Sequence, residues 1–356
     1  MNFLKKLFLG LFATAMILVI VYMLGPKLSE QKLTIHYPEV PEIAGLEEYI
    51  QHREDSVIGL KDGNEAYIIW ADTTKKEKTP YSIVYIHGFG ASPMEGDPVH
   101  RFLAAHFGAN LFVTRLPEHG IKRSNGLEYL SPQALADAAG EAYQIGKRLG
   151  EEVIVVGTSM GGALTLLLAS QQPEIKAIVT YSPAIRDNGE QLALFFEPWG
   201  LKVMEIIMTE NSVLHQERTG EKAMYWSEDY HIHGYESLAI LMYSEMNQET
   251  FKEINQPTFL GYYYKSDEEQ DFVVSVPKML EMFDALGTKR ELKKKEAFPD
   301  SGNHVIASSI TSGDWEGVLF STIDFLENTV GIKPAAAFGN QVEELMKLPN
   351  KSEAVN

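Results

Sequence analysis

The sequence places one serine in a setting that could make its hydroxyl reactive. Gly157-Thr158-Ser159-Met160-Gly161 follows the apolar, β-branched run 153–156 and precedes a run of small residues and leucines, 162–170. This order predicts a strand, a tight turn with Ser159 at its tip, and a helix, which is the setting of a nucleophile elbow. Small residues at 157 and 161 leave room for a strained backbone at the serine. The alternative is an ordinary glycine-serine turn between a strand and a helix.

A serine hydroxyl is a poor nucleophile near neutral pH, so it needs a base, and the base needs a partner that fixes its tautomer. His304 lies in a loop between the last predicted strand and the last predicted helix. Asp271 follows an earlier predicted strand, and the apolar residues after it would hold its loop against the core. Asp267 is nearer the strand end and is the alternative acid. We therefore predict Ser159 as nucleophile, Asp271 as acid and His304 as base.

Acyl transfer also needs two hydrogen-bond donors for the oxyanion that develops on the carbonyl. The predicted strand 81–86 ends in His87-Gly88-Phe89-Gly90, where the chain can turn tightly and direct a backbone N–H into a pocket. The backbone N–H groups of Phe89 and Met160 are the predicted donors. His87 could instead act as a catalytic base, but we favour a histidine that is hydrogen-bonded within the turn.

The elements that must position these residues alternate between strands and helices. Strands are predicted at 66–70, 81–86, 110–114, 153–156, 175–181, 258–263 and 292–298. Helices are predicted at 97–107, 132–149, from 160 onward, at 276–286 and at 314–328. This alternation predicts an α/β fold with a mostly parallel central sheet and helices on both faces. Residues 186–255 break the alternation, and their Phe, Trp and Met content predicts a helical insertion that covers the C-terminal edge of the sheet.

Taken together, these motifs resemble those of the serine α/β-hydrolases, in the branch of the carboxylesterases, monoacylglycerol lipases and lysophospholipases. The resemblance covers roughly residues 65–330. It rests on the segments His87–Gly90, Arg115–Gly120, Gly157–Gly162, Asp271–Val274 and Asn303–Val305. It implies an α/β-hydrolase fold and cleavage of carboxylic esters through an acyl-enzyme, without a metal or an organic cofactor. Glu118 departs from the family, where many relatives have glycine before a His-Gly pair that is usually structural.

The apolar insertion and the N-terminal segment together suggest a small-molecule ester that is lipophilic, such as a monoacylglycerol or a lysophospholipid. One alternative is an amidase or peptidase that uses the same three residues. Another is a non-catalytic, membrane-tethered binding protein on a hydrolase fold, because a fold does not guarantee an activity.

The chain has a formal net charge of -18 and no cysteine. The charge argues against nucleic acid as a partner, because phosphate binding needs clustered lysine and arginine. The absence of cysteine from the sequence excludes thiol catalysis, zinc-thiolate sites, disulfides and a lipidated cysteine.

The N-terminus predicts a membrane segment. Lys5 and Lys6 precede Leu7–Leu24, a run of 18 residues without a charge, and Gly25-Pro26-Lys27 ends it. The run is long enough to span a bilayer. We predict an uncleaved signal anchor in the inner (cell) membrane, single-pass, with a cytoplasmic N-terminus and the catalytic domain outside the cytoplasm. The alternative is a cleaved signal peptide and a secreted or periplasmic domain.

We expect five parts along the chain: a membrane anchor or signal peptide at 1–27, a spacer and lead-in at 28–65, a hydrolase core at 66–185 and 256–333, a lid at 186–255, and a disordered tail at 334–356.

Overall fold

Seven strands form one sheet in the order β1-β3-β2-β4-β5-β8-β9. The computed structural model describes residues 2–208 and 212–335. The strands are β1 Tyr67–Ile69, β2 Thr79–Ile86, β3 Asn110–Val113, β4 Gly150–Thr158, β5 Ala177–Tyr181, β8 Thr258–Tyr262 and β9 Lys293–Ala297. β1 is antiparallel to β3, and the other neighbouring pairs are parallel. The predicted mostly parallel sheet is confirmed.

The alternation of side chains along β2 explains why the sheet has a core on each face. Val84 and Ile86 belong to one hydrophobic cluster, and Ile83 and Tyr85 belong to the other. Successive side chains of a strand point to opposite faces, so a strand that is covered on both sides reads as an unbroken apolar run. The first cluster includes α4 Pro132–Leu149 and α5 Met160–Gln171, and the second includes α3 Val99–Phe107 and α11 Trp315–Asp324.

Helix α4 has the bounds that the sequence predicts, because both of its ends carry local signals. The hydroxyl of Ser131 accepts a hydrogen bond from the N–H of Ala134, and Pro132 occupies the first turn. Both features stabilise a helix start. Gly150 follows the last helical residue and begins β4, which leads to the turn at Ser159.

The insertion after β5 contains helices and one small sheet. Its elements are η3 Gln191–Phe196, α6 Gly200–Met208, β6 Val213–His215, α7 Glu221–Tyr225, β7 Asp229–His231, α8 Ile232–Ile240, the π-helical turn η5 Leu241–Glu245, and α9 Gln248–Glu253. β6 and β7 pair in antiparallel fashion, which the sequence analysis did not predict. A strand of three residues is too short to give a period-two pattern.

The lead-in before β1 contains helical structure for which the sequence analysis made no prediction. After the short η1 Ile43–Gly45 it forms α2 Leu46–Asp55. Only Leu46, Ile50 and Glu54 of α2 are buried. The buried stripe is one side chain wide and includes a glutamate, so the sequence shows little hydrophobic periodicity there. Glu54 binds Arg115 of the core, and both side chains are less than a tenth exposed.

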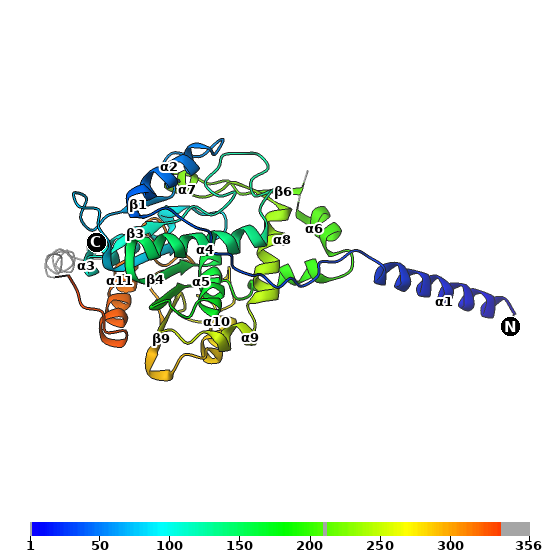
Figure 1. Ribbon diagram of the computed structural model, residues 1–356. Coiled ribbons are helices and arrows are strands. Elements are labelled where there is room, and N and C mark those ends of the chain that lie inside the picture. The colour runs from blue at the N-terminus through cyan, green and yellow to red at the C-terminus, as the bar shows by residue number, and fades with distance from the viewer. Residues whose placement is uncertain (1, 209–211, 336–356) are drawn as a thin grey trace, which may run out of the picture.

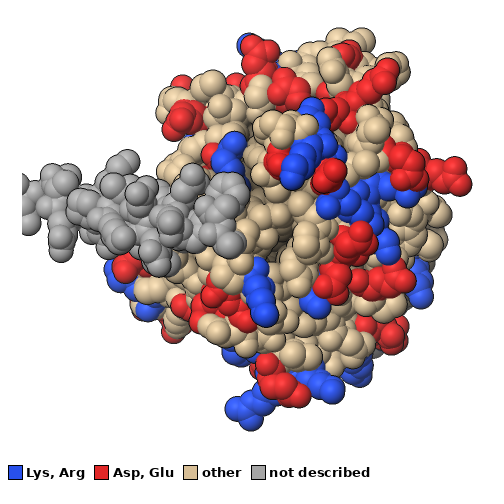
Figure 2. Space-filling model, turned by 60° about the vertical axis from the view of Figure 1, so that its left-hand side comes forward, with Lys and Arg blue, Asp and Glu red and all other residues tan. Residues whose placement is uncertain are grey.

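Helix α1 Asn2–Met23 extends away from the sheet (Figure 1). Within Phe3–Met23, a window of 18 residues has a mean hydropathy of 2.2 and none of it is buried, so the helix is long and apolar enough to cross a membrane. After Val276–Ala285 (α10), η6 Arg290–Leu292 precedes β9, and η7 Phe325–Thr329 continues α11. Residues 336–356 of the expected tail lie outside the described residues. On the face drawn in Figure 2, acidic and basic side chains are interspersed.

Candidate active site

Ser159 lies at the turn between β4 and α5 with φ 54° and ψ -119°, a conformation that non-glycine residues rarely adopt. Its N–H donates to the carbonyl of Tyr181 over 2.9 Å. The flanking glycines are required because a side chain at either position would have no space. A Cβ at 157 would lie 2.3 Å from the Gly161 carbonyl oxygen, and a Cβ at 161 would lie 2.0 Å from the Ile86 carbonyl oxygen. The turn therefore has the geometry of a nucleophile elbow.

His304 and Asp271 are brought together by loops that follow β9 and β8. The Nδ1 of His304 lies 2.6 Å from Oδ2 of Asp271, whose side chain is fully buried. The other carboxylate oxygen, Oδ1, accepts the N–H groups of Val273 and Val274 over 2.9 and 3.0 Å. Burial opposes protonation of the imidazole, but the charge and hydrogen bond of Asp271, with a contribution from Glu95, outweigh it and raise the pKa of His304 above 6.5.

Asp267, the alternative acid, has a different environment. Its side chain is exposed and accepts a hydrogen bond from the hydroxyl of Tyr264 over 3.0 Å. Among the described residues, Asp267 forms neither a hydrogen bond nor an ion pair with His304. The geometry therefore associates His304 with Asp271.

Ser159 and His304 line one cavity of about 850 Å³. Nε2 of His304 is buried and has no hydrogen-bond partner within residues 2–208 and 212–335. The two side chains therefore share the cavity without a direct hydrogen bond between them. Catalytic hydrogen bonds are often long or poorly aligned before substrate binds, so this arrangement is compatible with proton transfer from the serine.

The two predicted oxyanion donors flank Ser159. Met160 is the first residue of α5, and Phe89 lies in the turn after β2 and lines the cavity. Neither backbone N–H donates to another group of the described residues. Both are therefore free to donate to a ligand.

His87 supports the turn after β2. Its Nε2 accepts the N–H of Leu116 over 3.0 Å, so Nδ1 carries the proton and donates to the carbonyl of Gly88 over 2.9 Å. Complete burial, with the nearby imidazole of His119, lowers the pKa of His87 well below its usual value. His87 is therefore neutral, and each of its ring nitrogens forms a hydrogen bond with the backbone, as we favoured.

Most of the cavity wall is apolar. It includes Leu192, Leu194, Met204, Ile207, Leu214, Trp226, Leu238, Met242, Phe272 and Val273. All of these except Phe272 and Val273 come from the insertion between β5 and β8. A long hydrocarbon chain would find contacts along this wall.

Glu95 is a buried acid beside the nucleophile that the sequence analysis missed. It is 2% exposed, lines the cavity, and accepts the N–H of Gly88 over 2.5 Å. A Cβ on Gly88 would lie 2.9 Å from Oε1 of Glu95 and 3.0 Å from Cβ of Ser159, so the two side chains are neighbours. Burial raises the pKa of Glu95 to about 7, against the opposing effects of the Gly88 hydrogen bond and of His304. No pattern in the sequence distinguishes Glu95 from a surface acid.

Two cationic side chains, Arg218 and Lys222, also line the cavity. Arg218 donates to the carbonyl of Ser227, to Oε1 of Gln216 and to the hydroxyl of Tyr230, which are all neutral acceptors. No carboxylate of the described residues forms a salt bridge with Arg218 or Lys222. The cavity wall therefore includes two cationic side chains that no carboxylate of the described residues pairs with.

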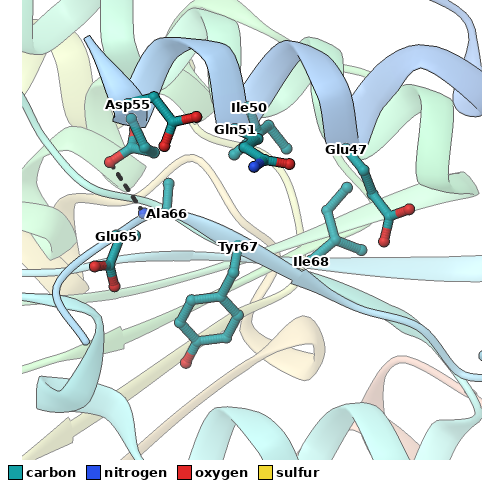
Figure 3. Close-up of a pocket in the computed structure, with 9 residues that line it drawn as sticks. Glu47, Ile50, Gln51, Asp55, Glu65, Ala66, Tyr67 and Ile68 are labelled. Atoms are coloured by element: carbon teal, nitrogen blue, oxygen red, sulfur yellow. Dashed lines mark hydrogen bonds between the residues drawn. The ribbon is translucent and has the colours of Figure 1, made fainter. Parts of the chain in front are cut away.

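A smaller pocket of about 250 Å³ lies between α2 and β1 (Figure 3). Its wall includes Glu47, Glu54, Asp55 and Glu65, and Oε2 of Glu54 accepts the N–H of Ala66 over 3.3 Å. None of the residues that we predicted for the active site lines it.

Comparisons with known proteins identify the family and the fold. The sequence profile of the Alpha/beta hydrolase family matches residues 83–308. A thermostable monoacylglycerol lipase of Bacillus sp. (strain H-257) is 30% identical over 109 residues, which are 31% of this chain and 43% of the relative. A putative esterase/lipase 2 of Mycoplasma pneumoniae is 29% identical over 110 residues, which are 31% of this chain and 40% of the relative. The chain thus spans less than half the length of these two relatives.

Solved structures show the same fold at low sequence identity. One of the metagenome-derived lipolytic enzymes LipS and LipT has a TM-score of 0.60 at 19% identity, with 76% of this chain and 99% of that chain covered. The monoacylglycerol lipase of Paleococcus ferrophilus has a TM-score of 0.53 at 18% identity, with 74% and 99% covered.

Proposed function

We propose that this chain, which belongs to the alpha/beta hydrolase family, is a serine hydrolase that cleaves carboxylic esters through an acyl-enzyme. The observation that carries the proposal is the shared cavity. Ser159, at its strained turn, and His304, bound to Asp271 over 2.6 Å, both line it. The lipase and esterase descriptions of the relatives support the same reaction class.

In the proposed reaction, the Ser159 hydroxyl approaches Nε2 of His304, which has no other partner, and gives up its proton as its oxygen attacks the ester carbonyl. The carbonyl C–O π electrons move to the oxygen, and the N–H groups of Phe89 and Met160 stabilise that charge. Collapse of the intermediate expels the alcohol, which His304 protonates. Water then attacks the acyl-enzyme, again with His304 as base, and Ser159 leaves with its proton restored. Asp271 stabilises the imidazolium in both halves of the reaction.

The apolar wall supports a lipophilic acyl group as substrate, as in a monoacylglycerol or a lysophospholipid. Arg218 and Lys222 favour the second of these, because a phosphate could take the place of the carboxylate that they lack. We therefore place lysophospholipids first among the substrates. A loss of lysophospholipid hydrolysis in Arg218→Gln that exceeds its loss of monoacylglycerol hydrolysis would support this order.

We also propose that α1 anchors the protein in the inner membrane as an uncleaved signal anchor, with the catalytic domain outside the cytoplasm. Its length and hydropathy support an anchor. Sequencing the N-terminus of the membrane-bound protein tests this, because a cleaved signal peptide would leave a chain without residues 2–23.

The test of the proposed function is labelling of the full chain with a fluorophosphonate, followed by turnover of p-nitrophenyl esters. Wild type should label at Ser159 and hydrolyse the esters, and Ser159→Ala should do neither while it keeps its fold. Hydrolysis of matched anilides at a comparable rate would instead indicate an amidase. Folded protein that does not label would indicate a binding protein on this fold.

A further inference from the structure

The rim of the active-site cavity carries an exposed apolar surface. We define the rim as Leu194, Val203, Ile206, Ile207, Phe272 and Val273, each of which is between 41% and 83% exposed. Leu194, Ile207, Phe272 and Val273 also line the cavity, so the exposed apolar surface borders the cavity. Isolated exposed apolar residues are ordinary, but a contiguous set around the mouth of a site indicates a partner.

Residues next to the rim form hydrogen bonds with the C-terminal end of helix α1 and the residues that follow it. The indole Nε1 of Trp199 donates to the carbonyl of Val21 over 3.0 Å, and its backbone N–H donates to the carbonyl of Pro26 over 2.8 Å. Leu28 donates its N–H to the carbonyl of Phe195 over 3.1 Å. These contacts hold the C-terminal end of α1 against the segment that leads into α6, and Figure 1 shows α1 leaving the body of the molecule near α6.

The chemistry of α6 suits the boundary between water and lipid. Lys202 and Glu205 form an ion pair of 2.6 Å within the helix, so they add no net charge to it. Val203, Ile206 and Ile207 project their side chains outward. Trp199 at the start of the helix is 37% exposed, and its amphipathic ring is of the kind that gathers at membrane interfaces. With a net charge of -18, the chain as a whole offers little attraction to anionic headgroups, so contact would rest on apolar insertion.

We propose that the rim inserts into the surface of the membrane that α1 spans, so that the cavity opens into the lipid and takes its ester from there without passage through water. If α1 spans the membrane, its C-terminal end lies at the membrane surface. That end is bound to Phe195 and Trp199, and the rim residues Leu194 and Val203 lie on either side of this segment in the sequence. This inference rests on the proposed function for its substrate, and on the anchor role of α1 for its orientation.

The absence of cysteine from the sequence makes a direct test clean, because one introduced cysteine is the sole labelling site. The full chain is reconstituted in phosphatidylcholine vesicles with an environment-sensitive fluorophore at Ile206→Cys. Ile58→Cys is the matched control, because Ile58 is 94% exposed and lies in the lead-in. We expect nitroxide-bearing lipids to quench the label at 206 several-fold more than the label at 58, and aqueous iodide to show the reverse order.

Two outcomes of this measurement would overturn the inference. One is a label at 206 that is as accessible to iodide as the label at 58. The other is a label at 206 that is shielded from both quenchers, together with cross-linking between chains through that cysteine. The second result would assign the rim to a contact between two copies.

A kinetic experiment distinguishes failure of this inference from failure of the proposed function. Ile206→Glu is compared with Ile58→Glu and wild type on water-soluble p-nitrophenyl butyrate and on p-nitrophenyl palmitate in vesicles. We expect Ile206→Glu to lower palmitate turnover by about tenfold, because a charge opposes insertion of the rim, and to leave butyrate turnover unchanged. Equal turnover of palmitate by Ile206→Glu and Ile58→Glu would overturn the inference. Failure of wild type to hydrolyse butyrate would refute the proposed function, and the quenching experiment would still decide the position of the rim.

Discussion

Nδ1 of His304 lies 2.6 Å from Oδ2 of Asp271, across loops that follow two neighbouring strands. This contact raises the pKa of the imidazole against the effect of burial, and it leaves Nε2 directed away from the carboxylate. A histidine held in this way can accept a proton at Nε2 and be stabilised as an imidazolium at Nδ1.

Asp271→Asn should abolish most activity, because an amide neither stabilises the imidazolium nor fixes the tautomer that leaves Nε2 free. Loss of the acid of such a triad typically costs about 10⁴-fold in turnover. Asp267→Asn, in the same loop but exposed, is the control and should keep wild-type kcat/KM on p-nitrophenyl butyrate. A larger loss in Asp267→Asn than in Asp271→Asn would reverse the assignment.

The pH dependence of kcat/KM should report the base. The proposed reaction needs neutral His304, whose pKa is raised above 6.5, so activity should fall as the pH drops through that raised value. Glu95→Gln removes a negative charge that contributes to the shift, and the acid limb should therefore move to lower pH. The profile is measured in wild type, Glu95→Gln and Asp267→Asn. If the acid limb of Glu95→Gln coincided with that of wild type, electrostatic coupling between Glu95 and His304 would be excluded.

Glu95 should also make stability pH-dependent. Its pKa is about 7 in the folded chain against an ordinary value of 4.5, so the folded state binds the extra proton and stability is lost as the pH rises from 4.5 through 7. Glu95→Gln is neutral at every pH. Between pH 5 and pH 8 its free energy of unfolding should rise relative to that of wild type by up to about 3 kcal/mol, because each pKa unit between the folded and unfolded states corresponds to about 1.4 kcal/mol. Urea unfolding at the two pH values measures this. A constant difference between the two proteins would contradict it.

Gly161→Ala should damage the elbow. The new Cβ would lie 2.0 Å from the Ile86 carbonyl oxygen and 2.6 Å from that of His87, and backbone atoms cannot move aside as a flexible side chain can. Overpacking of this kind costs about 1–3 kcal/mol, and a shift of Ser159 should also slow fluorophosphonate labelling. Gly10→Ala, which would meet nothing within 4 Å, is the control. Labelling of Gly161→Ala at the wild-type rate, with an unchanged melting temperature, would argue against this geometry.

Glu54→Ala should destabilise the fold through Arg115. The side chain of Arg115 is 7% exposed and that of Glu54 is 4% exposed, so removal of the carboxylate leaves a buried guanidinium without its partner. Breaking a buried pair in this way costs about 3–5 kcal/mol. Glu48→Ala, on the exposed side of the same helix, should change the free energy of unfolding little. Equal effects of the two variants would show that the pair contributes nothing.

Local sequence determined much of this protein. The bounds of α4 follow from Ser131, Pro132 and Gly150, because capping and helix termination depend on adjacent residues. The turn at Ser159 follows from its glycines for the same reason, and the alternation of strands and helices gave the mostly parallel sheet. α2, β6 and β7 were not predicted, because a stripe one side chain wide and strands of three residues carry almost no periodic signal.

Tertiary structure alone decided which distant groups meet. The choice of Asp271 over Asp267 as the neighbour of His304 depends on the path of a loop, and the sequence left both open. The place of Glu95 beside Ser159, and the contact of Trp199 with the end of α1, have no counterpart in any local pattern. The physical reason is the distance along the sequence between the residues that interact. Helix caps, turns and strand periods arise from neighbours in the chain, whereas a buried charge or a cavity wall is defined by segments that only the packed fold brings together.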